Sequence, residues 1–207
     1  MMKQNAMDQY HYIAFFKPFD VLSQFTSEAG HASLADFGPF PQSVYAAGRL
    51  DVDSEGLLIL TDDAQLKHRL TSPEFGHPRT YLVQVEGIPD PRSIRRLESG
   101  VLIERKKTLP ATAELLSVEP HLPERSKPIR FRKSVPTSWL KLTLREGRNR
   151  QARKMTAAVG YPTLRLVRVN IGRIGLDGLK PGEQRTLSRK DVMELREDLG
   201  LMRMRER

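Results

Sequence analysis

The 207-residue chain contains no cysteine. This absence excludes disulfide bonds, thiol nucleophiles and thiolate metal sites. No apolar run approaches the ~20 residues that span a bilayer, and the polar start MMKQNAMDQYHY lacks the apolar block of a secretory signal. We therefore expect a cytoplasmic protein without membrane contacts. Metal binding is not expected either, because the five histidines show no metal-ligand spacing; they are His11, His31, His68, His77 and His121.

The common cofactor motifs are also absent. The sequence has no GxxxxGK[ST] phosphate loop, no GxGxxG fingerprint, no HExxH zinc motif and no GxSxG nucleophile elbow. We therefore expect no nucleotide, nicotinamide or metal cofactor. An enzyme with this sequence would use its side chains alone.

Positive charge is what the chain has in excess. Its 34 Lys and Arg residues outnumber 25 Asp and Glu residues, which gives a formal net charge of +9. Such a field attracts polyanions, of which nucleic acid is the commonest. The alternative is a solvated basic surface without a partner. Arginine dominates the basic segments, and its planar fork pairs with phosphate, which favours a nucleic-acid partner.

Hydrophobic periodicity indicates a mixture of strands and helices. Apolar or alternating runs predict strands before the Lys17-Pro18 turn and at 57–60, 80–86, 139–145 and 164–171. Capping and turn signals predict helices after Asp62 or Asp63, from Asp90-Pro91 to Gly100, from Arg150 to Gly160, and after Ser188. Because strands follow strands as often as they follow helices, we expect an α+β fold with a largely antiparallel, mixed sheet.

Gly48-Arg49-Leu50-Asp51 is the first candidate for chemistry, because it precedes the buried apolar run at 57–60. Asp51 can be a turn residue that solvates the start of a strand, or a functional carboxylate held at a cleft beside Arg49. The sequence physics leaves both open. The neighbouring acids have plainer interpretations: Asp53 and Glu55 as turn and surface residues, and Asp62 and Asp63 as helix caps.

Two further segments combine basic and aromatic character. Tyr81 follows Arg79 on the apolar face of an alternating strand, where it is either a core residue or a stacking surface for an unpaired base. The segment 145–154 is the most basic and coincides with a predicted helix start, where free amides also attract anions. Its cations need a phosphate or an internal carboxylate as partner, unless they form only a solvated helix face.

Three segments together resemble the RsuA group of pseudouridine synthases: GRLDVDSEGLLILTDD, RTYLVQVEG and REGRNRQARKMTAAVGYPTLRLVRVNIGRIGL. FKPFDVLSQFT and LKPGEQRTL resemble the first and last motifs of the group, so the similarity runs from about Ile13 to Leu199 in the family's order. Within the group, the chain is most similar to a short member that acts on large-subunit ribosomal RNA. Members usually carry an S4-like RNA-binding domain first, whereas this chain begins on the catalytic region. We therefore expect one pseudouridine synthase domain at 10–200, with a central RNA-binding cleft and with tails at 1–9 and 201–207.

The resemblance implies that a uridine in ribosomal RNA is isomerised to pseudouridine without a cofactor. It implies that Asp51 is the catalytic aspartate and that Tyr81 packs on the target uracil. Arg153 would pair with the catalytic carboxylate, and Arg49 would occupy the space left by the flipped-out nucleotide. The RNA-binding residues that we expect are Arg49, Arg79, Arg148, Arg150 and Lys154.

The main alternative is a non-catalytic RNA-binding or ribosome-assembly protein on the same fold. Such a protein needs the basic segments but not the combination of Asp51, Tyr81 and Arg153. A DNA-binding protein is a weaker alternative, because helix-turn-helix and zinc-finger spacings are missing. We expect a monomer whose RNA specificity comes from the proline-rich loop at 119–138 and the basic helix at 150–160.

Overall fold

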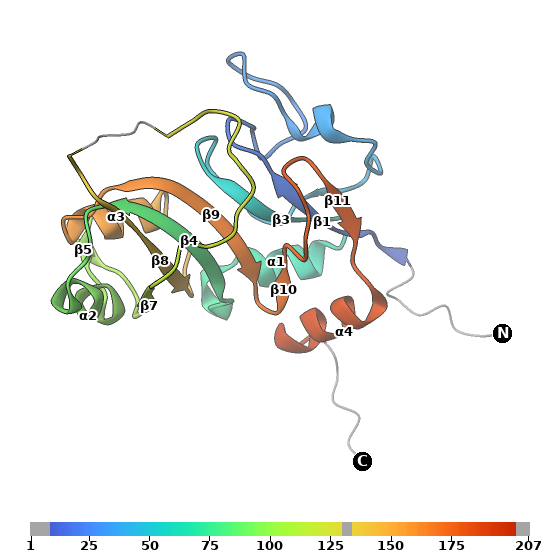
Figure 1. Cartoon of the computed structure of the whole chain (residues 1–207). Coiled ribbons are helices and arrows are strands. Elements are labelled where there is room, and N and C mark those ends of the chain that lie inside the picture. Colours follow the sequence, from blue (N-terminus) through green and yellow to red (C-terminus); the bar gives the residue numbers. More distant parts are fainter. Residues whose placement is uncertain (1–8, 130–133, 202–207) are drawn as a thin grey trace.

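The computed structural model describes residues 9–129 and 134–201, and one long sheet runs through the molecule (Figure 1). The strands are β1 (Tyr12–Lys17), β2 (Tyr45–Ala46), β3 (Glu55–Thr61), β4 (Arg79–Glu86), β5 (Leu102–Ile103), β6 (Lys106–Lys107), β7 (Thr112–Leu115), β8 (Thr137–Leu144), β9 (Thr163–Ile171), β10 (Ile174–Gly175) and β11 (Gln184–Thr186). The α-helices are α1 (Ala64–Thr71), α2 (Pro91–Ser99), α3 (Gln151–Ala158) and α4 (Arg189–Asp198). The sheet order is β11-β1-β3-β9-β4-β8-β7, with β2 beside β3 and β10 beside β9.

The first half of the sheet is buried on both faces. Every residue of β1 and β3 is buried, which confirms the prediction of a doubly covered strand at 57–60. Leu57 and Ile59 pack with Leu66 of α1 and with apolar residues of α4, and these two helices lie together on one side of the sheet (Figure 1). Leu58 and the other alternate residues pack on the opposite side, against the segment that includes Leu34. The doubly packed strands give the loop before β3 a rigid base.

The second half of the sheet has its own core. Val83 of β4 and Leu142 of β8 are fully buried with Leu97 of α2 and Met155 of α3. Tyr81 packs against this cluster and also against the cluster that contains Leu58 and Leu34. Its ring therefore lies where the two halves of the molecule meet.

The two halves join through β3 and β9, which pair in parallel, while the other strand pairs within the described sheet are antiparallel. The register places Gly56 opposite Arg168. Gly56 has a φ of +110°, and a Cβ at this position would lie 2.2 Å from the backbone oxygen of Arg168. Only glycine allows the two strands to approach this closely.

Most predicted elements are confirmed, and so is the α+β class with a mixed, mostly antiparallel sheet. Asp63 caps α1, because its side chain accepts a hydrogen bond from Leu66 N at 2.9 Å. Asp62 is not a cap, since its carboxylate binds the backbone N of His11 at 2.7 Å. The sequence analysis missed the β5–β6 hairpin and the short strands β7 and β11.

The predicted loop at 119–138 contains no helix or strand within its described residues 119–129 and 134–136, and β8 begins at Thr137. The predicted tails at 1–9 and 201–207 lie almost entirely outside the described residues. No helix within 9–129 and 134–201 is long and apolar enough to cross a membrane.

Candidate active site

Asp51 lies in the loop that leads into β3, and hydrogen bonds hold the backbone on both sides of it. Ser23 Oγ accepts from Leu50 N at 3.0 Å and donates to Leu50 O at 2.8 Å. Asp20 N donates to Val52 O at 2.8 Å. The side chain of Asp51 stays 33% exposed. The local structure thus fixes the backbone of Asp51 while leaving its carboxylate accessible.

A cavity of about 420 Å³ opens beside Asp51, between its loop, β4, β9 and the start of α3. This volume falls within the range of ~300–1,000 Å³ that is typical of small-molecule sites. The predicted site residues that line the cavity are Arg49, Asp51, Arg79, Tyr81, Arg148 and Arg150. Arg153 and Lys154 follow on α3 and are not part of this lining. The fold therefore gathers most of the predicted site residues around one cavity.

Asp53 holds the arginines at the start of α3. Arg150 donates to both carboxylate oxygens of Asp53, at 2.9 and 2.7 Å. Arg153 donates to the backbone oxygen of Asp53 at 2.6 Å, and its Nε lies 3.5 Å from Asp53 Oδ2. Arg150 Nη1 lies 3.7 Å from Asp51 Oδ2. The partner of Arg153 is therefore Asp53 and not the expected Asp51. Asp53 lies in a turn, as expected, but its pairing with the arginines was not predicted.

The charged groups in this cluster shift one another's pKa values. Burial of Asp53 opposes ionisation, but the hydrogen bond from Arg150 and the charge of Arg153 outweigh it and lower the pKa of Asp53. The hydrogen bond to Asp53 raises the pKa of Arg150. Asp53 and both guanidinium groups are therefore ionised at neutral pH.

The remaining cations are held mainly by backbone carbonyl groups. Arg79 Nη2 donates to Leu70 O at 2.5 Å, and burial lowers the pKa of Arg79. Arg148 Nη2 donates to Ile103 O at 2.7 Å, which ties the rim of the cavity to the β5–β6 hairpin. Carbonyl oxygens orient these guanidinium groups without neutralising them, and the only carboxylate within 4.0 Å of Arg148 among the described residues is Glu104, at 3.9 Å.

Lys154 has a carboxylate partner, since its Nζ forms an ion pair with Glu104 in the β5–β6 turn. Asp53 and Glu104 are thus the internal carboxylates that the sequence analysis offered as one possible partner for the basic helix. Arg49 is exposed at the rim of the cavity.

Sequence reasoning missed three buried polar residues beside Asp51. Arg168 is 3% exposed and lines the cavity, as does Ser54, which is 1% exposed. Lys17 is fully buried, its Nζ donates to Val21 O at 2.6 Å, and burial lowers the pKa of Lys17 to about 7. The available signal was a charged residue within an apolar strand, as in the run LRLVRVNI.

Glu55 is also placed differently from the expectation. It is 2% exposed and binds Arg165, which donates from Nε at 2.9 Å and from Nη2 at 2.7 Å. The interpretation of Glu55 as a surface residue is therefore wrong. The pair lies at the start of β3, where it links this strand to β9.

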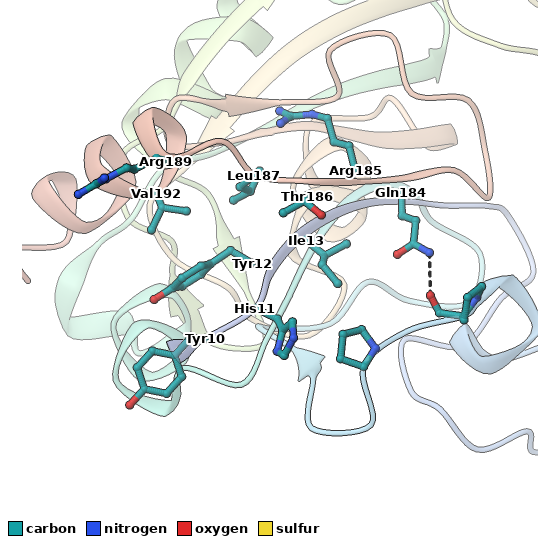
Figure 2. A pocket seen from close by; sticks show the side chains of 12 residues that line it. Tyr10, His11, Tyr12, Ile13, Gln184, Arg185, Thr186, Leu187, Arg189 and Val192 are labelled. Carbon is teal, nitrogen blue, oxygen red and sulfur yellow. Dashed lines mark hydrogen bonds between the residues drawn. The ribbon is translucent and has the colours of Figure 1, made fainter. Parts of the chain in front are cut away.

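A larger cavity, of about 570 Å³, lies at the β1–β11 edge of the sheet (Figure 2). Tyr10, His11 and Arg189 are part of its lining, and Gln184 Nε2 donates to Pro39 O at 3.0 Å beside it. None of the predicted site residues lines this cavity. The candidate chemistry is therefore concentrated at the smaller cavity beside Asp51.

Comparison with known proteins identifies the family. Residues 11–158 match the RNA pseudouridylate synthase family. The chain belongs to this family. It is 50% identical over 186 residues to the ribosomal large subunit pseudouridine synthase E of Vibrio vulnificus, covering 90% of this chain and 79% of the relative. It is 55% identical over 167 residues to the protein of the same name from Xanthomonas axonopodis pv. citri, covering 80% of this chain and 87% of the relative.

A solved structure described as a pseudouridylate synthase supports the same assignment. It matches this synthase with a TM-score of 0.75 at 30% identity, covering 90% of this chain and 74% of the other. The predicted pseudouridine synthase fold and the prediction of an isomerase that modifies RNA are thus confirmed.

Proposed function

We propose that this pseudouridine synthase isomerises a uridine of large-subunit ribosomal RNA and that Asp51 is its catalytic aspartate. The names of the relatives that are 50–55% identical support this RNA class. The observation that carries the assignment of Asp51 is its position: an accessible carboxylate on a fixed loop, in a cavity that it shares with Tyr81 and several arginines.

The reaction places clear demands on Asp51. Its carboxylate must be ionised, whether it attacks the sugar or the base or removes a proton from the ribose. The Arg150 guanidinium lies 3.7 Å from Asp51 Oδ2. This distance is longer than a hydrogen bond, so the oxygens of Asp51 remain free to contact the substrate.

The target nucleotide has to leave its base stack before it reaches the cavity. Extrusion costs a few kcal/mol, and less in a loop than in a duplex. Tyr81 offers its ring on the cavity wall, and stacking on an aromatic ring recovers about 1–3 kcal/mol per base. The exposure of Arg49 at the rim supports its proposed entry into the space that the nucleotide leaves.

The experiment compares Asp51→Asn with Asp90→Asn. Asp90 caps α2 away from the cavity, and asparagine preserves this capping function. Both variants and the wild type are assayed for tritium release from uridine labelled at carbon 5, in large-subunit and in small-subunit ribosomal RNA. We expect release only from large-subunit RNA, its abolition in Asp51→Asn, and wild-type release in Asp90→Asn.

Two results contradict parts of this proposal. Turnover close to wild type in Asp51→Asn would remove Asp51 from the chemistry. Binding of ribosomal RNA by the wild type without pseudouridine formation would favour the non-catalytic alternative.

A further inference from the structure

Arg168 is a buried guanidinium for which the described residues provide no counter-ion. Its Nε donates to Leu57 O at 2.8 Å, but Nη2 is buried without any hydrogen-bond partner among residues 9–129 and 134–201. No carboxylate of these residues lies within 4.0 Å of the Arg168 guanidinium. An unpaired buried charge and an unmade buried hydrogen bond both destabilise a fold. A ligand that enters the cavity could satisfy both.

The backbone positions this side chain in a specific way. Arg168 lies opposite Tyr81 on β4, so the two side chains share one face of the sheet. The β4–β9 register shifts between Thr80 and Tyr81, and an irregularity of this kind redirects neighbouring side chains. On the other side, Gly56 lets β3 approach the backbone of Arg168. The fold therefore brings the guanidinium to the cavity wall beside the proposed stacking residue.

Ser54 is a second buried polar group in the same situation. Its Oγ is buried without a partner among the described residues, and Ser54 lines the cavity together with Arg168. It stands three residues after Asp51 and two before Gly56. The two residues that carry these unsatisfied donors thus line a cavity that also contains the proposed catalytic aspartate.

We propose that Arg168 hydrogen-bonds a carbonyl oxygen of the target uracil and stabilises the negative charge of the base when it detaches, with Ser54 as a second donor. This inference rests on the proposed function of the site. It assigns a base-binding and charge-stabilising role to residues that the sequence analysis did not select.

The chemistry explains why a cation is useful here. When the C1′–N1 bond breaks, its electron pair leaves on the uracil, and the charge spreads over N1 and the two carbonyl oxygens. The new bond then forms between C1′ and carbon 5, the proton on carbon 5 is lost to solvent, and N1 takes up a proton. Atoms and electrons balance. A guanidinium fixed in a water-poor site stabilises such an anion far better than one in water.

The test uses chemical rescue. Arg168→Ala removes the guanidinium and opens a space next to the cavity, which a free guanidinium ion can fill. Single-turnover tritium release is measured at saturating ribosomal RNA, with guanidinium at concentrations below those that unfold the protein, and with urea as the neutral control of the same shape. We expect a loss of about 10²–10³-fold, as for other charge-stabilising donors, that guanidinium partly reverses and urea does not.

Two further variants separate charge stabilisation from a structural role. Arg168→Lys keeps a cation and Arg168→Met does not, so the lysine variant should be faster even if the alanine variant fails to fold. Arg173→Ala removes an arginine just after the same strand, outside the cavity and paired with Asp198, and guanidinium should not change its single-turnover rate.

The possible outcomes distinguish this inference from the proposed function. A wild-type protein that forms no pseudouridine contradicts the proposed function. An active wild type with an equally active Arg168→Ala overturns only the role of Arg168. A slow Arg168→Ala that guanidinium and urea leave unchanged, or equal rates for the lysine and methionine variants, overturns it as well.

Discussion

Asp53 accepts both hydrogen bonds from the guanidinium of Arg150, whereas Asp51 lies 3.7 Å from the same group. The proposed catalytic carboxylate is therefore near a cation that another carboxylate holds. We therefore expect Asp53 to act as a positioning residue that holds Arg150 and Arg153 away from Asp51.

We expect Asp53→Asn to lower the single-turnover rate by about 10²-fold, the usual effect of a misplaced catalytic group, with a smaller change in RNA affinity. Asp53→Glu, which keeps the charge, should recover part of the rate. Asp198→Asn is the control, since Asp198 pairs with Arg173 outside the cavity. Equal rates for wild type and Asp53→Asn would show that the arginines hold their positions without this carboxylate.

RNA affinity should depend on the cations at the rim. Arg49 is exposed on the cavity wall, where it can meet a phosphate. We expect Arg49→Ala to weaken binding and to reduce the slope of log K against log salt by about 1, the value for one phosphate contact. Fluorescence anisotropy over a salt series measures this slope. Arg95→Ala, on the exposed face of α2, should leave the slope unchanged.

The buried ion pair between Glu55 and Arg165 should have a large effect on the free energy of unfolding when only one partner is removed. Removing one partner leaves the other charge buried, so Glu55→Gln should lower the free energy of unfolding by about 3–5 kcal/mol. Replacing both residues, as in E55L/R165M, should restore most of this loss. Asp198→Asn breaks the exposed pair with Arg173 and should cost at most about 1 kcal/mol. Urea unfolding measures all three, and a Glu55→Gln loss as small as that of Asp198→Asn would contradict the expectation.

His77 should make stability depend on pH in the acid range. Burial, together with the charge of Arg79, lowers the pKa of His77 from 6.5 to about 4. The unfolded chain therefore binds a proton first as the pH falls, and stability decreases between pH 6.5 and 4. The loss from this residue should be about 3 kcal/mol. Denaturant unfolding of wild type and His77→Asn across this range isolates the effect, and parallel pH profiles would exclude it.

Gly56 should tolerate no side chain. In Gly56→Ala, the new Cβ would lie 2.2 Å from the backbone oxygen of Arg168, so the β3–β9 joint must separate. Gly30→Ala is the matched control, because Gly30 also has a positive φ but has open space around it. We expect about 1 kcal/mol of destabilisation at Gly30 and much more at Gly56, measured by thermal unfolding. Similar losses at both positions would mean that backbone conformation, not crowding, explains Gly56.

The sequence predicts best those structural features that depend on residues close together in the chain. The cap at Asp63, the limits of α2 at Asp90 and Gly100, and the alternation of Tyr81 and Val83 are all local signals. The three-residue strand β11 was missed because a run of that length has no periodicity.

The ion pairs in and beside the site could not be predicted from such local patterns. Asp53 meets Arg150 across 97 positions, and Glu55 meets Arg165 across 110, so no local pattern connects them. Asp51 was selected from its neighbours by the family resemblance, which also suggested Arg153 as its partner but gave no role to Asp53. Its catalytic role, like the monomeric state, stays a prediction.

The parallel pairing of β3 and β9 also determines at which stage of protein synthesis the site can form. Arg168 donates to the oxygen of Leu57, which was made 111 residues earlier, and β9 lies between β3 and β4 in the sheet. Until β9 is made, a nascent chain carries the Asp51 loop beside an open edge of β3. Because a domain folds as a unit, the cavity wall proposed to bind the base forms only after β9 has been made.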